Sequence, residues 1–175
     1  MGGGISENRA VSELFEQRGA TFSPCGRYRT RLWRIWGDQP PAVFCMLNPS
    51  TADETSNDPT VERCERRARA TGFGGLQVVN LFALRSTDPR ALYSEIDPIG
   101  PGNDEAILDA CAGAGIVVCA WGAHGKFRAR GNWVRDLLYD AGARPHVLAL
   151  NRDGTPKHPL YVGYNVQPTP WGIEP

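Results

Sequence analysis

Residues 42–53 read AVFCMLNPSTAD, and this stretch decides the fold. Its first six residues form a continuous apolar run, which predicts a strand buried on both faces of a sheet. The polar half places an amide, a rigid Asn-Pro turn and two hydroxyl groups directly after that strand. In open α/β folds ligands bind at the carboxyl ends of the strands, so the end of this strand is the first candidate for a functional site.

Three further apolar runs predict three more buried strands, at residues 76–82, 115–121 and 145–150. Helices are predicted between them. The first opens at Asp58-Pro59, with Asp as the N-cap and Pro at the first helical position, and others cover 103–112 and 131–139. Apolar strands that alternate with helices pair in parallel and are covered on both faces. The pattern therefore predicts an α/β fold, a three-layer α/β/α sandwich with a central four-stranded parallel sheet.

The residues before this core predict one more strand and an arm. Between 27 and 36, Tyr28 and Leu32 alternate with arginines, which indicates a half-exposed strand. A short turn then leads into the run at 42–47, so we expect this strand to be an antiparallel edge neighbour of that run. Residues 1–22 are interpreted as a flexible N-terminal arm in which 11–18 suit a short helix. The remainder, 23–175, is long enough for one domain.

Bulk composition excludes several classes of protein. Nineteen Lys and Arg residues balance 19 Asp and Glu residues, which argues against nucleic-acid binding driven by bulk charge. No apolar run approaches the roughly 20 residues that span a bilayer, and the N-terminus lacks the basic and apolar regions of a signal peptide. We therefore expect a cytoplasmic monomer that does not bind a membrane.

Cysteine and glycine patterns exclude common cofactors. The five cysteines are scattered and none forms a Cys-x-x-Cys pair, so no disulfide framework, zinc site or iron–sulfur cluster is expected. The phosphate-binding patterns G-x-x-x-x-G-K and G-x-G-x-x-G do not follow the first buried strand. The sequence therefore predicts no cofactor and no metal.

Polar side chains accompany the ends of all four buried strands. Asn48 follows the first strand, Asn80 lies in the second, His124 follows the third, and His158 follows the fourth after a short loop. The carboxyl ends of parallel strands share one edge, so we expect these side chains to gather there. Each has an alternative interpretation: Asn48 can start a turn, His124 can start a helix and His158 can be exposed. Asn80 is the hardest to dismiss, because a buried amide needs partners.

Other residues near this edge have competing interpretations. Asp53 suits a water or metal ligand beside Asn48, whereas Asp58 suits the helix N-cap. Arg85 can bind phosphate or face solvent. Trp121 can stack on a base or pack into the core, and core packing is the commoner outcome for an aromatic side chain.

Several blocks of the chain resemble the bacterial and phage family DUF1643. Its members share an opening LNPSTAD…DPT…C, a centre GGxxVVNLFAxRxxDP and a close HPLY. Here the blocks are residues 47–53, 58–60 with Cys64, 74–85 with Asp88-Pro89, and 158–161. Because several distinct blocks recur in the same order, over about residues 27–165, the resemblance is specific.

This family in turn resembles the uracil-DNA glycosylase superfamily. Residues 47–50 are similar to its first-strand motif G-[IM]-N-P-G, Val79-Asn80 to a later strand that ends in Asn, and His158-Pro159 to its C-terminal His-Pro loop. The resemblance implies a uracil-DNA-glycosylase-like fold, a four-stranded parallel sheet between helices, in agreement with the architecture predicted above.

The resemblance also implies a chemistry. Asn48 would position the water that attacks the sugar C1′, Asn80 would bind the Watson–Crick edge of a flipped base, and His158 would donate to the base O2 as charge develops there. The remaining expected site residues are Pro49, Ser50 and Trp121 at the base; Thr51, Asp53, Arg85, His124 and Lys157 at water or phosphate; and Leu160 and Tyr161 as a wedge loop.

These roles imply a DNA base glycosylase, whose partner is single- or double-stranded DNA. Two alternatives remain open: a non-catalytic module that binds a nucleotide or modified base, and an enzyme that acts on free nucleotides, which fits the zero net charge best. Two positions depart from the superfamily pattern. Ser50-Thr51 replace a glycine in the pocket wall, and Leu160 replaces a serine whose hydroxyl contacts phosphate.

Overall fold

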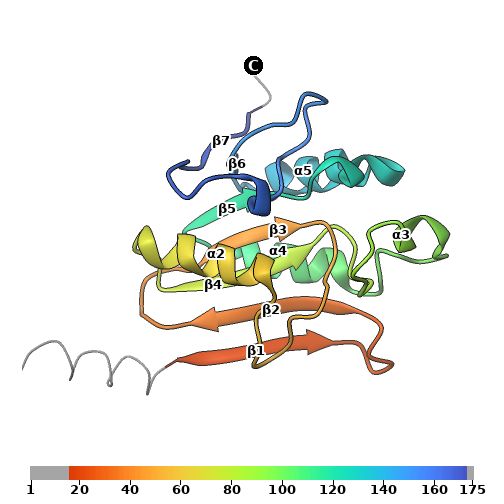
Figure 1. Ribbon diagram of the computed structural model, residues 1–175, viewed down its shortest axis with the longest axis horizontal. Helices are drawn as coiled ribbons and strands as arrows, with labels where there is room; N and C mark the ends of the chain where they lie inside the picture. The colour runs from red at the N-terminus through yellow and green to blue at the C-terminus, as the bar shows by residue number, and fades with distance from the viewer. Residues whose placement is uncertain (1–15, 173–175) are drawn as a thin grey trace, which may run out of the picture.

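Residues 16–172, which the computed structural model describes, contain one sheet of seven strands in the spatial order β1-β2-β4-β3-β5-β6-β7 (Figure 1). The strands are β1 (Gln17–Phe22), β2 (Arg29–Ile35), β3 (Ala42–Met46), β4 (Gly75–Asn80), β5 (Ile116–Cys119), β6 (Pro145–Val147) and β7 (Thr169–Pro170). The four central strands β4, β3, β5 and β6 pair in parallel. The predicted α/β class and parallel core are confirmed.

The sheet is larger than the predicted four strands with one edge strand. The hairpin β1–β2 extends it antiparallel beyond β4, and the two-residue β7 pairs antiparallel with β6. Residues 17–22, assigned from the sequence to a flexible arm, are strand β1, and residues 1–15 of that arm, including most of the helix suggested at 11–18, lie outside the described residues. Weak hydrophobic patterning concealed β1, because only Gly19 of this edge strand is buried.

The predicted neighbour of β2 was wrong. β2 pairs with β4 and not with β3, because β3 is flanked on both sides by β4 and β5 and has no free edge. The connection from β2 to β3 crosses the start of β4, where the amides of Trp36 and Gly37 both donate to the carbonyl of Gly74. A Cβ on Gly74 would lie 2.1 Å from the carbonyl oxygen of Gln39, so only glycine permits this crossing.

Helices cover both faces of the sheet. They are α2 (Pro59–Ala70), α3 (Ala91–Ser94), α4 (Asn103–Ala112) and α5 (Arg130–Asp140), with the 3₁₀ segments η1 (Ala123–Ala129) and η2 (Pro159–Tyr161). In Figure 1, α2 lies in front of the sheet and α4 behind it. Val61, Cys64 and Ala68 of α2 enter the core on one face. Ile107 of α4 and Val134 of α5 enter the core on the other face, which gives the three layers.

The start of α2 agrees with the predicted signal. Asp58 is its N-cap and accepts a hydrogen bond from the amide of Val61 at 2.9 Å, with Pro59 in the first turn. This cap fixes where the chain from β3 re-enters regular structure, and so fixes the loop at residues 47–57. Within residues 16–172, no helix is long and apolar enough to cross a membrane.

Candidate functional site

A pocket of about 580 Å³ opens at the carboxyl ends of the parallel strands. Met46 of β3 and Asn80 of β4 are register partners, and Trp121 is the second residue after β5, so three strand ends form its floor. The N-terminus of α2 and the segment η2 form its walls. The position is the one that a parallel sheet gives to ligands.

Nine of the residues expected at the site line this pocket: Asn48, Ser50, Thr51, Asn80, Trp121, His124, His158, Leu160 and Tyr161. They come from chain segments more than 100 residues apart, and the sheet brings them together as the strand-end argument predicted. Their chemical roles stay predictions, whereas their common location is a property of the fold.

Four expected residues do not line the pocket. Pro49 is buried beside it, and its carbonyl accepts from the amide of Ser86. Asp53 uses its carboxylate to accept from the amides of Thr55 and Ser56, within its own loop. Arg85 donates to the carbonyl of Gly26 and lies over the ring of Phe22, and its guanidinium is therefore held outside the pocket. Lys157 also lies outside, and its amide donates to the carbonyl of Ala149.

Asn80 is the most buried polar side chain among the expected residues. It is the last residue of β4 and is 2% exposed. Its Oδ1 atom has no hydrogen-bond partner among the described residues. An unsatisfied buried acceptor costs about 1–3 kcal/mol. A ligand N–H group that reached this oxygen would remove that cost.

The two polar atoms of the Asn48 side chain differ, because Nδ2 makes hydrogen bonds and Oδ1 makes none among the described residues. Its Nδ2 atom faces three backbone carbonyls, those of Ser86 at 3.0 Å, Pro49 at 3.2 Å and Leu84 at 3.4 Å. Because all three partners are acceptors, the nitrogen must face them, and Oδ1 remains available as an acceptor. Asn48 therefore does hold the turn, as one interpretation expected, and it also lines the pocket.

His158 lies just before η2, half-buried. Its Nδ1 atom accepts from the amide of Leu160 at 3.3 Å, which assigns the proton of the neutral ring to Nε2. Burial lowers the pKa of His158, and the negative charge of Asp58 opposes that shift. The imidazole is thus kept neutral near pH 7, with one N–H to donate.

The mouth of the pocket is formed by aromatic and aliphatic side chains. A hydrogen bond of 2.8 Å between Nδ1 of His124 and the hydroxyl of Tyr93 joins η1 to α3. Leu160 and Tyr161 are 40% and 74% exposed. Trp121 lines the pocket but is mostly a core residue, because it is buried and its ring packs edge-on against Trp171.

The sequence argument missed Arg29, which lines the pocket and is 2% exposed. Alternation between 27 and 36 placed it on the solvent face of a half-exposed strand. In the fold, its guanidinium donates to the carbonyl of Ala52, so the loop after β3 covers it. Because the loop that buries Arg29 lies 23 residues further along the chain, no pattern near Arg29 in the sequence indicates its burial.

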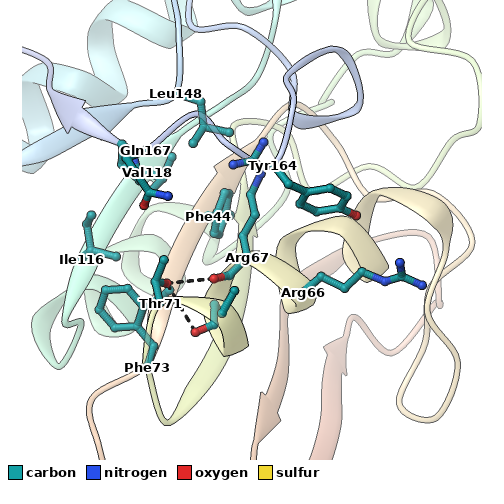
Figure 2. A pocket seen from close by; sticks show the side chains of 14 residues that line it. Phe44, Arg66, Arg67, Thr71, Phe73, Ile116, Val118, Leu148, Tyr164 and Gln167 are labelled. Atoms are coloured by element: carbon teal, nitrogen blue, oxygen red, sulfur yellow. Dashed lines mark hydrogen bonds between the residues drawn. The ribbon is translucent and has the colours of Figure 1, made fainter.

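A second pocket, of about 330 Å³, lies between α2, the sheet and residues 164–168 (Figure 2). Its walls are mainly apolar, and Phe44, Val118 and Leu148 point into it. Among its polar groups, the hydroxyl of Thr71 donates to the carbonyl of Arg67, and the Nη atoms of Arg67 donate to backbone carbonyls of residues 162–166. It offers space for an apolar group and carries no arrangement for catalysis.

Within residues 16–172, no group of three or more His, Cys, Asp or Glu side chains is placed to hold a metal ion. No curated protein matches the chain significantly. No solved structure matches it significantly either. One family does match, over residues 27–160, from β2 to η2, and this span includes all the strand ends described above. The chain therefore belongs to DUF1643, a family described as proteins of unknown function.

Proposed function

We propose that this protein binds a nucleobase in the strand-end pocket and hydrolyses the N-glycosidic bond that joins it to the sugar. The unpartnered Oδ1 of Asn80 carries the proposal. A ligand N–H group would satisfy this oxygen, such as the N3–H of a uracil or thymine ring or the exocyclic amine of cytosine. The planar ring of a base would also fit in the pocket between the end of β4 and the neutral ring of His158.

The reaction adds water across the bond between C1′ and the base nitrogen. The hydroxyl goes to C1′, the electron pair of the broken bond goes to the base, and the remaining proton ends on the base. A pyrimidine that leaves in this way gathers negative charge on O2. A neutral imidazole that donates from Nε2 stabilises that charge without acting as a strong acid. His158 has this protonation state, which supports its assignment.

Asn48 supplies the acceptor for the attacking water. Its Nδ2 is held by three carbonyls, so the free Oδ1 has a fixed direction. An acceptor that is already oriented lowers the entropic cost of placing a water molecule beside C1′. Asn48, Asn80 and His158 thus divide the work into water positioning, base recognition and leaving-group stabilisation.

The form of the substrate is a separate question. The exposed Leu160 and Tyr161 at the rim favour a DNA glycosylase of the uracil-DNA glycosylase type, in which a wedge loop fills the duplex after base flipping. The balanced charge of the chain favours a free nucleotide. Both forms would use the same pocket.

Two assays test the proposal together. Oligonucleotides with normal, deaminated and phage-type modified bases are incubated with the protein, and alkali then breaks any strand that has lost a base. In parallel, chromatography follows release of free base from nucleosides and nucleotides. Base release that depends on Asn48 and His158 is expected. If no substrate of either class loses its base, hydrolysis is ruled out, and binding that depends on Asn80 alone would identify a non-catalytic base-binding module.

A further inference from the structure

Arg29, the first residue of β2, is a buried cation with few partners. It is 2% exposed and is the one arginine or lysine among the residues that line the strand-end pocket. Its guanidinium makes one hydrogen bond, from Nη1 to the carbonyl of Ala52 at 2.8 Å. Among the described residues, Nε has no partner and no carboxylate lies within ion-pair distance. A buried charge in this state is costly unless something else neutralises it.

The other buried arginines are satisfied differently. Arg34 donates to several carbonyls and to the side chain of Asn57. Arg67 donates from its Nη atoms to three carbonyls of the segment after η2, although its Nε atom, like that of Arg29, has no partner among the described residues. Arg130 donates to the carbonyl of Leu81 and forms an ion pair with Asp104. These three brace the fold from within, whereas Arg29 lines the pocket with most of its donors uncommitted.

The wall beside Arg29 is formed by the N-terminus of α2, which includes the carboxylate of Asp58. The amide of Ala52, whose carbonyl holds Arg29, donates to Asp58, the N-cap of α2. This contact places the guanidinium next to the start of a 12-residue helix, where the helix dipole favours anions. Thr60 of that helix and Ser50 of the loop also line the pocket. The carboxylate of Asp58 is engaged by two backbone amides, those of Ala52 and Val61.

We propose that Arg29 and the N-terminus of α2 bind the terminal phosphate of a free nucleotide whose base reaches Asn80. This inference rests on the proposed function and specifies its substrate class. A phosphodiester inside a DNA strand has chain on both sides, so it reaches exposed cations and not one at the floor of a pocket. A terminal phosphate can enter. The pocket, at about 580 Å³, lies within the roughly 300–1,000 Å³ typical of small-ligand sites.

The ionisation of Arg29 agrees with this role. Burial lowers the pKa of Arg29 to about 10, and the nearby negative charge of Asp58 opposes this shift. The guanidinium therefore stays charged at neutral pH, and its planar fork matches phosphate oxygens in a bidentate geometry.

Calorimetry on the full chain tests the inference. Each common nucleoside, in ribose and deoxyribose form, is compared with its 5′-monophosphate, and a single-stranded oligonucleotide without terminal phosphates is added as a third ligand. We expect at least one monophosphate to bind about tenfold or more tightly than its nucleoside. Arg29→Met should remove this difference. Arg31→Met, which removes a charge from the same strand outside the pocket, should leave it intact.

Three results would overturn the inference: no monophosphate binds more tightly than its nucleoside, the difference survives in Arg29→Met, or the oligonucleotide binds as tightly as the best monophosphate. If Arg29→Met does not fold, the wild-type protein decides, because inorganic phosphate must then weaken binding of the monophosphate and not of the nucleoside. Base release without any phosphate preference would remove this inference and leave the proposed function. A phosphate preference without base release would remove hydrolysis and leave the anion site.

Discussion

The side-chain amide of Asn103 donates to the main-chain carbonyl of Asn80 at 2.9 Å. It also donates to the carbonyl of Leu81, and Arg130 donates to that same carbonyl from the next helix. The strand end that carries Asn80 is therefore held from the opposite face of the sheet, by α4 and α5. The position of the pocket amide depends on two residues that do not line the pocket.

Asn103→Ala should remove the two side-chain hydrogen bonds that hold this strand end. Two buried carbonyls lose a donor, so the free energy of unfolding should fall by about 1–3 kcal/mol and nucleobase affinity should fall as the Asn80 side chain loses its fixed direction. Chemical denaturation and calorimetry measure the two effects. Ile107→Val on the same helix is the matched control, since it should cost about 0.5–1.5 kcal/mol without touching Asn80. Equal losses of affinity in both variants would show that Asn103 acts through stability alone.

Asn80→Leu should separate stability from binding. Leucine has a similar shape and removes a buried acceptor that has no partner, so the free energy of unfolding should stay level or rise. Base affinity should fall by about tenfold or more, because the apolar side chain cannot accept from the Watson–Crick edge. Denaturant titration and ligand titration of the same preparation provide the comparison. A protein that is clearly destabilised yet binds as before would mean that Asn80 serves the fold.

The pH dependence should follow His158. Its pKa in the folded protein lies below the ordinary value of 6.5, so the unfolded chain binds the proton more readily. The resulting stability is present above about pH 6.5 and is lost as pH falls through the folded-state pKa. His158→Asn retains a side-chain acceptor for the amide of Leu160 and should flatten this part of the stability curve. A curve that keeps its slope below pH 6.5 in this variant would assign the titration to another group.

The parallel core was predictable from local patterns, and its edges were not. The apolar runs, and the cap at Asp58, act within a few residues, so they indicate where strands and helices begin. Which strand lies beside β2 depends on the free edges of the assembled sheet, and alternation within 27–36 carries no such information. Arg29 illustrates the same limit, because it is buried by the loop after β3, which contains Ala52 and is distant from Arg29 in the sequence. Asn48, Asn80 and His158 were found because the ends of parallel strands must meet at one edge.

Asp58→Asn tests the anion site by removing a neighbouring negative charge that would repel a bound phosphate. Asparagine caps a helix about as well as aspartate, so α2 should keep its N-terminus and stability should change little. The negative charge that acts on Arg29 disappears, and affinity for the monophosphate should therefore rise a few-fold, most strongly at low ionic strength. The affinity for the matching nucleoside should stay unchanged, because it places no charge at the α2 N-terminus. A parallel rise for nucleoside and monophosphate would instead indicate a general rearrangement of the pocket, and calorimetry at two salt concentrations distinguishes the two outcomes.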